Sequence, residues 1–337
     1  MKTGISRMLS IAVLLLLSSG CSPNRQKVNV TPVASPSPAG ELVPWKTIER
    51  VAVMQGHEDP IFSLAISPDR TVLLAGSFDG TVREWDIKTG KPLREWQLAN
   101  SASAIQFSPD GKSFVTGDGG GNVRRWNANT GKLEAAYVGH PFIVTDVAIS
   151  PDGKILATGS WDRTVKLWNL ATGQLLRTIA GHAQPIQSIA FSPDGKRIVS
   201  ADYDGFVKLW DVNTGKFLRA YAGNSFPVHR VLFSSDGQKI ATASQDGTIR
   251  SWDVKSGLGT ATIQAHSEAV TDIASIDAGK VLVSTSGDGT VKFWDIATRR
   301  QLNTLKGNVI LKMASSNDGS WLATGDRDGT IELLKGI

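Results

Sequence analysis

The chain has 337 residues, enough for one large or two medium domains, and its composition is ordinary for a globular protein apart from ten Trp and thirty-four Gly. The formal net charge is +5, and it falls to +3 without Lys2 and Arg7, which lie in a leader that we expect to be removed. So weak a basic excess, with no run of Lys and Arg, argues against a nucleic-acid partner.

The first twenty residues have the layout of an export signal. Lys2 and Arg7 give a positive start, residues 9–17 form an apolar stretch too short to span a bilayer, and small residues then precede Cys21. The segment resembles the signal peptide of bacterial lipoproteins, in which the cysteine is lipidated on sulfur and becomes the new N-terminus. This resemblance implies that residues 1–20 are a signal peptide and that Cys21 carries the lipid.

The lipoprotein motif has one departure here. Its Leu usually stands three residues before the cysteine, where this chain has Ser18, with Leu17 one residue further back. A plain secretory signal is therefore an alternative to lipidation. A simple buried or free thiol is a further alternative, but Cys21 is the only cysteine and lies where cleavage would fall. Ser22, in place of Asp, favours the outer membrane if the host is Gram-negative.

Residues 21–44 are expected to form the lipidated Cys and a disordered tether. The segment after Cys21 is rich in Ser, Pro, Asn and Val and has little to bury. Fully extended at roughly 3 Å per residue, it would reach at most about 70 Å. The two or three acyl chains of a mature lipoprotein would hold it stably, where a single chain would not.

The rest of the chain is built on one repeat. Six Trp residues, each followed by Asp or Asn, are spaced 41, 42, 42, 42 and 42 residues apart: Trp85, Trp126, Trp168, Trp210, Trp252 and Trp294. A seventh copy has Leu334 in the Trp position. Six residues before these positions stand Asp79, Asp162, Asp204, Asp246, Asp288 and Asp328, with Gly120 in the second copy. Four copies carry a His upstream, namely His57, His140, His182 and His266.

Each repeat contains three tight turns. The first has the form Ser-Pro-Asp-Gly, as at 150–153; the second centres on the Asp before the Trp; the third is Thr-Gly-Lys or Thr-Gly-Gln, as at 172–174. Three turns leave four strands. Residues such as Val165 and Leu167 alternate with polar ones at a period of two, and no repeat shows sustained helical periodicity.

The Gly-His start, the turn Asp and the Trp-Asp end resemble WD40 repeats over about residues 50–337. This resemblance implies an all-β fold: a seven-bladed β-propeller of four-stranded antiparallel blades, spanning residues 45–337. The last repeat ends after its third strand, and an apolar segment, residues 50–54, precedes the first Gly-His. We expect that N-terminal segment to supply the fourth strand of blade seven, which would close the ring and remove its exposed edges.

His, Asp and Ser recur together, as in His140, Asp162 and Ser160, and could be taken for a catalytic triad. The WD40 resemblance implies a structural network instead, in which His, a strand hydroxyl, the turn Asp and the Trp indole satisfy one another. The expected members are His57, Asp79, Trp85, His140, Asp162, Trp168, His182, Asp204, Trp210, Asp246, Trp252, His266, Asp288 and Trp294. Because an enzyme needs one active site and not four copies, no catalytic residue and no enzymatic activity is predicted.

The sequence predicts no metal site and no cofactor. The histidines lie in different repeats and none has the spacing of a zinc motif. Asp202-Tyr203-Asp204-Gly205 resembles part of a calcium loop but lacks its distal Glu, and residues 117–121 are neither a Walker nor a Rossmann loop. Departures from the repeat occur at Leu98, Asn224 and Asn308, which replace His, and blades two and seven are expected to be the least stable.

Two positions per repeat are expected to lie on the face that carries the His and Asp turns. The residues before the turn Asp are Phe78, Gly119, Trp161, Tyr203, Gln245, Gly287 and Arg327. The residues five after the His position are Phe62, Ser103, Thr145, Gln187, His229, Thr271 and Leu311. Aromatic residues and Arg are favoured in interface hot spots. The predicted partner-binding residues are therefore Phe62, Phe78, Trp161, Tyr203, His229 and Arg327.

We expect a non-enzymatic, membrane-anchored scaffold for protein–protein interaction in the bacterial cell envelope, monomeric and with an unidentified protein partner. The alternative is a propeller lipoprotein that binds a small ligand or carbohydrate in its channel or on its aromatic residues. An enzyme would need an acid/base pair outside the repeating network. A role in outer-membrane assembly rests on architectural analogy alone, because the propeller lipoproteins known there carry a different repeat.

Overall fold

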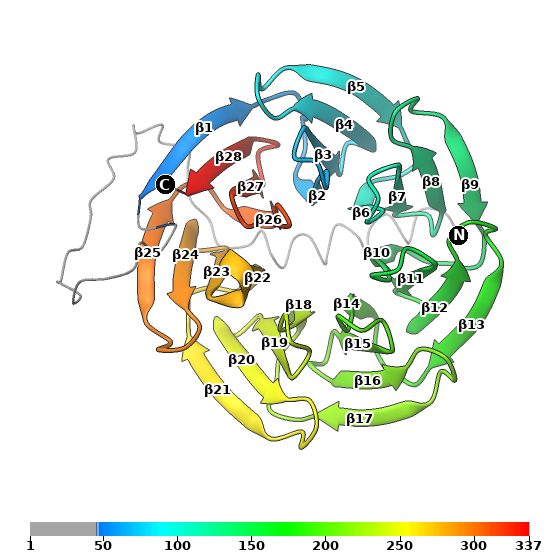
Figure 1. Cartoon of the computed structure of the whole chain (residues 1–337), viewed down its shortest axis with the longest axis vertical. Coiled ribbons are helices and arrows are strands. Elements are labelled where there is room, and N and C mark those ends of the chain that lie inside the picture. Colours follow the sequence, from blue (N-terminus) through cyan, green and yellow to red (C-terminus); the bar gives the residue numbers. More distant parts are fainter. Residues whose placement is uncertain (1–44, 46, 337) are drawn as a thin grey trace. The chain divides into compact units, whose positions relative to one another are not determined.

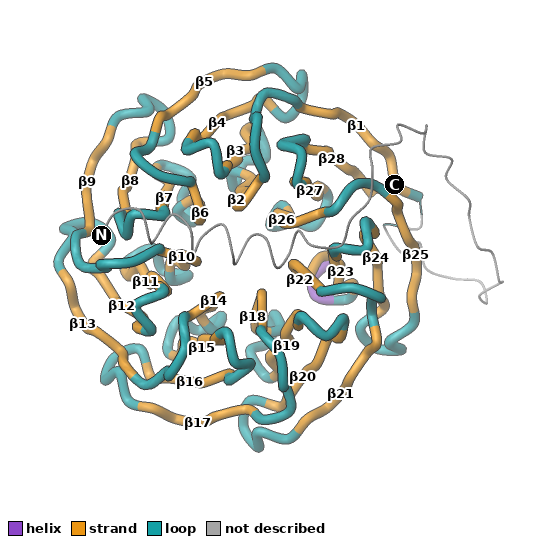
Figure 2. The backbone as a smooth tube through the Cα atoms, turned by 180° about the vertical axis from the view of Figure 1, so that it is seen from behind, coloured by secondary structure: helices purple, strands orange, loops and turns teal. Residues whose placement is uncertain are grey.

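The computed structural model describes residue 45 and residues 47–336. The predicted signal peptide, Cys21 and the tether lie outside these residues. The described chain forms seven four-stranded antiparallel sheets arranged as blades around a central axis (Figure 1). The prediction of an all-β, seven-bladed propeller is therefore confirmed. The only helical element among the described residues is a single 3-10 turn, η1 (Asp277–Gly279), coloured purple in Figure 2.

Each of blades 1 to 6 takes four consecutive strands, numbered from the axis outward. Blade 1 comprises β2 (Ile61–Ile66), β3 (Val72–Ser77), β4 (Thr81–Asp86) and β5 (Pro92–Gln97). Blade 2 comprises β6 (Ala102–Phe107), β7 (Ser113–Asp118), β8 (Val123–Asn127) and β9 (Leu133–Tyr137). Blade 3 comprises β10 (Val144–Ile149), β11 (Ile155–Ser160), β12 (Thr164–Asn169) and β13 (Leu175–Ala180). Blade 4 comprises β14 (Ile186–Phe191), β15 (Arg197–Asp202), β16 (Val207–Asp211) and β17 (Phe217–Tyr221). Blade 5 comprises β18 (Val228–Phe233), β19 (Lys239–Ser244), β20 (Thr248–Asp253) and β21 (Gly259–Gln264). Blade 6 comprises β22 (Val270–Ile276), β23 (Val281–Ser286), β24 (Thr290–Asp295) and β25 (Gln301–Lys306).

Blade 7 joins the two ends of the described chain. Its strands are β26 (Ile310–Ser315), β27 (Trp321–Asp326), β28 (Ile331–Gly336) and, outermost, β1 (Ile48–Met54). β1 pairs antiparallel with β28 from Ile48↔Gly336 to Met54↔Ile331. The predicted closure by an N-terminal strand is confirmed, and the strand begins two residues before the predicted 50–54. Figure 1 shows β1 beside β28 on the outer rim.

Burial falls from the second strand of each blade outward. β7 and β23 are buried at every position, because they are packed on both faces between neighbouring blades. The outermost strands are half exposed, since the blades diverge with distance from the axis; β13, for example, buries only Ile179. The burial of the second strands explains why their sequences read as nearly continuous runs of apolar and small residues.

The hydrophobic core is divided among the contacts between blades. Each of seven clusters combines residues of one blade with those of the next, and in six of them the repeat Trp of the later blade packs on the earlier one, as Trp168 packs on Val115 and Val123 of blade 2. Between blades 6 and 7 the repeat position is only Leu334. There Trp45, which is fully buried, stacks on Phe293 with ring centroids 5.3 Å apart and joins the Leu334 cluster.

The inner edges of the blades are joined by side chains. A strand next to the axis has one edge with no partner strand, so its backbone N–H groups need other acceptors. Asp146 accepts from the Ile189 N–H at 2.9 Å, Ser188 from the Val231 N–H at 3.2 Å, and Asp272 from the Met313 N–H at 3.1 Å. In each pair the acceptor belongs to one blade and the donor to the next. The ring is therefore connected by polar contacts as well as by its apolar core.

No helix in the described part of the chain is long and apolar enough to cross a membrane.

Candidate partner-binding face and central channel

One face of the ring, here called the top face, carries two kinds of loop. The strand registers place three parts of each blade on this face: the start of the innermost strand, the turn between the second and third strands, and the end of the outermost strand. In blade 1, for example, Ile61 at the start of β2 pairs with Ser77 at the end of β3, and Thr81 at the start of β4 pairs with Gln97 at the end of β5. The loops that contain the His positions and the turns that contain the Asp positions therefore share this face. The Ser-Pro-Asp-Gly and Thr-Gly-Lys turns lie on the opposite face.

Below the top face of blade 3 lies a buried chain of hydrogen bonds. Trp168 Nε1–H donates to Thr158 Oγ1 at 3.0 Å, His140 Nε2 lies 2.6 Å from the same oxygen, and His140 Nδ1 lies 2.6 Å from Asp162 Oδ2. Because a carboxylate only accepts, Nδ1 carries the proton and Nε2 accepts from the Thr hydroxyl. The hydroxyl in this chain is Thr158 and not Ser160, which donates to the Phe142 carbonyl.

Blades 4 and 6 repeat this chain with Ser in place of Thr. Trp210 and His182 meet at Ser200, with distances of 2.8 and 2.6 Å, and Trp294 and His266 meet at Ser284, with distances of 2.9 and 2.7 Å. These buried groups are satisfied by one another. The arrangement therefore stabilises the blade.

The carboxylate that meets the His comes from either of two positions. In blades 1, 3 and 6 it is the turn Asp, and a Ser two residues earlier accepts that residue's N–H, as Ser160 accepts from Asp162. In blade 4 the prediction of Asp204 is wrong: His182 Nδ1 lies 2.8 Å from Asp202 Oδ2, and Asp204 only donates its N–H to Asp202. Asp202 ends β15 at the position of those Ser residues.

Blades 2 and 7 also carry the carboxylate at the end of the second strand. Asp118 accepts from Asn122 and from Arg124 at 2.9 Å, and Asp326 accepts from Asn308 at 2.9 Å. Asp118 therefore supplies the carboxylate in the second repeat, where Gly120 stands at the position of the turn Asp. Sequence reasoning could have found this, because Asp replaces Ser eight residues before the Trp position in these three repeats.

Blades 1 and 5 show the network with a member missing. In blade 1, Ala75 replaces the strand hydroxyl, so that among the described residues His57 Nε2 has no hydroxyl partner, although Nδ1 lies 2.9 Å from Asp79. In blade 5, Asn224 replaces His, and Arg250 pairs with Asp246 at 2.8 Å. Trp252 donates to the Ala222 carbonyl instead of a hydroxyl.

Burial and hydrogen bonding set the charges of these groups. Burial alone would raise the pKa of Asp162, but hydrogen bonds from His140 and Thr164 lower it below its ordinary value. Asp79 and Asp288 behave in the same way, with Thr81 and His266 among the donors. Burial lowers the pKa of His57, which leaves its ring neutral at pH 7 beside a charged Asp79. These aspartates therefore act as fixed acceptors.

The predicted partner-binding residues differ in their surroundings. Tyr203 is 37% exposed, whereas Trp161 and Arg327 are half-buried. Phe62 and Phe78 are half-buried and pack edge to face on each other, with ring centroids 5.7 Å apart. The positions before the turn Asp thus reach the surface more than the positions at the start of the inner strands.

The second predicted set is used largely inside the ring. Ser103, Thr145 and Thr271 donate to the carbonyls of Val144, Ile186 and Ile310, each at the start of the next blade, and Leu311 is buried. His229 Nε2 lies 2.6 Å from Gln245 Oε1, and burial lowers the pKa of His229 to about 4. The hydroxyl side chains hold adjacent blades in register, whereas His229 is bonded within blade 5, and the set offers little free surface.

Three exposed aromatic residues on the top face were missed by the sequence analysis. Phe142, Phe206 and Phe226 have 45%, 54% and 51% of their surface exposed. They fall outside the two positions considered because Phe142 and Phe226 lie in the loops between blades. Phe206 occupies the place held by Thr in most other Asp-Gly-Thr turns. An unusually large apolar residue at a position that other repeats fill with Thr was the available signal.

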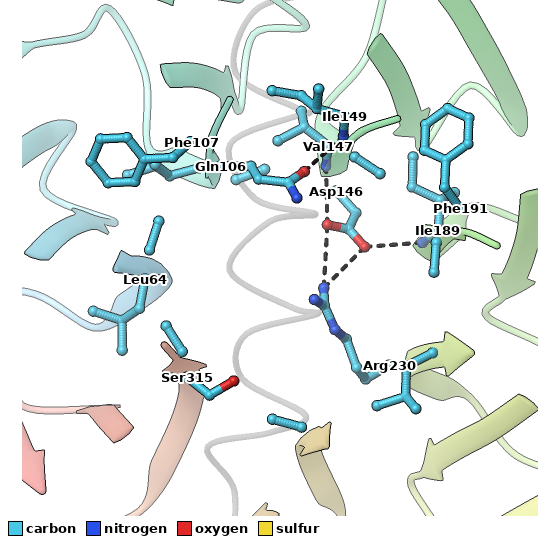
Figure 3. A pocket seen from close by; sticks show the side chains of 18 of the residues that line it. Leu64, Gln106, Phe107, Asp146, Val147, Ile149, Ile189, Phe191, Arg230 and Ser315 are labelled. Carbon is cyan, nitrogen blue, oxygen red and sulfur yellow. Dashed lines mark hydrogen bonds and ion pairs between the residues drawn. The ribbon is translucent and has the colours of Figure 1, made fainter. Parts of the chain in front are cut away.

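The central channel contains a cavity of about 570 Å³ lined by the innermost strands of all seven blades. From the channel wall, Arg230 points toward Asp146, at 3.2 Å (Figure 3). Arg230 also lies 3.5 Å from Asp272, so that it links blades 3, 5 and 6. Burial would lower the pKa of Arg230, but the two carboxylates together raise it. Gln106 accepts from the Ile149 N–H in the same region.

Among residues 47–336 no group of three His, Cys, Asp or Glu side chains could hold a metal ion. Within the channel, Arg230 is engaged with Asp146 and Asp272, and Gln106 with backbone, and Lys312 adds a further cationic side chain to the lining.

The fold and the repeated network define a seven-bladed β-propeller whose blades are pinned from within by Trp, His and Asp. The chain belongs to the WD40 family (WD domain, G-beta repeat), whose model matches it seven times, at residues 48–86, 90–127, 131–169, 173–211, 215–253, 259–295 and 299–333. Propellers of this family generally serve as non-enzymatic scaffolds that bind other proteins.

Curated relatives match over one short stretch. Eukaryotic translation initiation factor 3 subunit I of Botryotinia fuckeliana is 36% identical over 59 residues, which are 18% of each chain. The same subunit of Neurospora crassa is 36% identical over 59 residues, 18% of this chain and 17% of that protein, and that of Schizosaccharomyces pombe is 34% identical over 59 residues, 18% of each. The chain thus spans less than a fifth of the length of these relatives, and the matches show similarity in the repeat alone.

Proposed function

We propose that this propeller is a lipid-anchored scaffold of the bacterial cell envelope that captures another protein with the top face of blades 3 to 5. The observation that carries the proposal is the exposed aromatic surface of those blades, which includes Tyr203 and the half-buried Trp161. Exposed aromatic side chains on a rigid scaffold bury a large apolar area at little cost in conformational entropy, which is typical of binding surfaces.

Two observations support the proposed lipid anchor: the signal-like leader, and the position at which the described chain enters the propeller. Trp45 donates to the carbonyl of Gly319, in a turn on the face opposite the top face, and Ile48 pairs with Gly336 near the same edge. The described chain therefore enters the propeller on the face opposite the proposed binding surface. Lipidation at Cys21, and an outer-membrane location in a Gram-negative host, are part of this proposal.

Affinity capture of the native protein from detergent extracts, after crosslinking, tests the proposed binding face. Trp161→Ala with Tyr203→Ala should remove a defined partner from the captured set while the melting temperature changes little, because neither residue is fully buried. Leu93→Ala with Leu258→Ala, on outer positions that are 51% and 70% exposed, is the matched control. An unchanged set of captured proteins with the aromatic variant would show that this face is the wrong one.

The anchor has its own readout in the same cells. Cys21→Ser should move the protein out of the membrane fraction while its captured partner, in detergent, stays the same. Membrane association that persists in this variant would remove the lipid from the proposal.

A further inference from the structure

The top face is divided into two regions of different chemistry. The first, here called the aromatic arc, consists of Phe142, Trp161, Tyr203, Phe206 and Phe226 in blades 3 to 5. The Trp161 N–H donates to the Ile143 carbonyl at 3.0 Å, next to Phe142. A Cβ atom on Gly205 would lie only 2.6 Å from the Phe226 carbonyl, so the turn that carries Tyr203 and Phe206 rests on the loop that carries Phe226.

The second region, here called the acidic arc, consists of Glu58, Asp59, Glu268 and Asp328 in blades 6, 7 and 1. Glu58, Glu268 and Asp328 are exposed and Asp59 is half-buried. A Cβ atom on Gly329 would lie 3.0 Å from the Asp59 carbonyl, which places the Asp328 turn against the loop of Glu58 and Asp59.

The acidic arc carries an excess of negative charge. Its four carboxylates share these loops and strand ends with Arg327 and Lys306. Arg83 and Lys292 also donate to carbonyls of the same loops, but Arg83 is paired with Glu95 and Lys292 lies on the strand after the charged Asp288 turn. Below the surface, the charged Asp79 is paired with a His57 ring that burial keeps neutral, so that this pair also contributes negative charge. In the aromatic arc the exposed Asp204 is accompanied by the exposed Arg163 and by Lys208, whose Nζ lies 5.9 Å from the centre of the Phe206 ring.

The two arcs lie on opposite sides of the channel mouth. Figure 1 shows blade 4, at the middle of the aromatic arc, across the axis from blades 7 and 1. A segment that contacts both arcs must therefore cross the mouth of the channel. An extended segment is long enough to cross the mouth and contact both arcs, whereas a partner bound to one arc alone would make no contact with the other.

We propose that the partner presents an extended protein segment that places a large apolar or aromatic side chain on the aromatic arc and Lys or Arg side chains on the acidic arc. This inference rests on the proposed function and adds the chemistry of the partner. Apolar anchors provide affinity and opposite charges provide orientation and rate of association. The carboxylates repel nucleic-acid and lipid phosphates, which favours a cationic protein segment over either.

Selection of displayed random peptides on the detergent-purified full-length protein tests the partner chemistry directly. Enriched peptides should contain both aromatic or large aliphatic residues and Lys or Arg, separated by a spacer. Binding of a selected synthetic peptide should weaken about tenfold in Glu58→Gln with Glu268→Gln and Asp328→Asn, and it should weaken as salt is raised. The same peptide should also lose affinity for Tyr203→Gln with Phe206→Thr, which introduces residues found at these positions in other repeats.

A matched control removes equal charge elsewhere. Glu49→Gln with Glu95→Gln and Glu134→Gln, all exposed on the outer strands β1, β5 and β9, should leave peptide affinity unchanged. Melting temperatures measured for every variant identify any loss of folding.

The outcomes separate this inference from the proposed function. Enrichment of acidic or purely apolar peptides, equal binding to the charge-neutralised protein, or no enrichment at all would overturn the inference. A partner protein whose capture depends on Trp161 and Tyr203 would still support the scaffold in each of these cases. Loss of that capture dependence would instead remove the scaffold and the inference together.

Discussion

At the scale of single residues, the repeat tolerates a change in which residue supplies its carboxylate. Asp162 in the turn and Asp202 at the strand end both reach the His of their blade, because a tight turn brings the two positions close together. Alignment on the Trp positions predicted the network and its depth below the surface. It could not distinguish Asp202 from Asp204, because spacing along the chain says nothing about which of two neighbouring carboxylates points inward.

His229 makes stability depend on pH. Burial lowers its pKa to about 4 in the folded protein, whereas an unfolded His titrates near 6.5. As the pH falls below about 6.5, the unfolded chain takes up the proton first, so the contribution of the neutral ring is complete above that pH and is lost on the way to about 4. Between pH 7 and pH 4.5 the protein should lose about 2 kcal/mol more unfolding free energy than His229→Gln.

The comparison uses denaturant unfolding at each pH. Gln is the residue that blade 4 carries at the equivalent position, Gln187, so the variant keeps a side chain that the site accepts. Parallel pH profiles for the two proteins would show that the His229 ring is protonated as easily in the folded state as in the unfolded one.

At the scale of elements, β1 is the strand whose position depends on the whole ring. Its role could be predicted because the seventh repeat lacks a fourth strand and residues 50–54 had no partner. Trp45 could not be predicted, since it lies outside the repeat period and nothing in the spacing marks it. The structure shows why it matters: it fills the space beside Leu334 that a repeat Trp fills elsewhere.

Removal of this closure should destabilise the propeller strongly. Trp45→Ala should cost about 3–5 kcal/mol by leaving a cavity beside Phe293, and deletion of residues 46–55 should lower the melting temperature further by exposing the edge of β28. Val53→Ala, on the same strand but 50% exposed, is the control and should change little. A Trp45→Ala protein that melts with the parent would mean that the indole adds nothing to the contact between blades 6 and 7.

At the scale of the whole molecule, Arg230 connects blades that are not neighbours. Its guanidinium lies between carboxylates of blades 3 and 6 in the channel, and both of these carboxylates also accept backbone N–H groups of the following blade. The sequence could not indicate this contact, because each partner occupies the same place in its own repeat and only the closed ring brings them together.

Removal of the Arg230 cation alone should lower the free energy of unfolding more than removal of the cation and its two carboxylates together. Arg230→Met should lower the free energy of unfolding by about 3 kcal/mol, because it leaves two carboxylates close together without a counter-charge. Addition of Asp146→Asn and Asp272→Asn should recover most of that loss, since Asn still accepts a hydrogen bond from backbone. Chemical denaturation of the three proteins gives the comparison; equal stability of the single and triple variants would show that the carboxylates do not depend on Arg230.

The pairing of β1 with β28 has a mechanical consequence. A pull on the N-terminal side of the propeller first loads the buried Trp45. Once that contact yields, the pull runs along the axis of β1, because the strand enters at Ile48 and leads to the opposite face at Met54. The six residue pairs between β1 and β28 then share the load in shear and do not open one after another. In the proposed tethered arrangement, tension between the membrane and a bound partner would therefore be carried by the whole width of the ladder where the two ends of the ring meet.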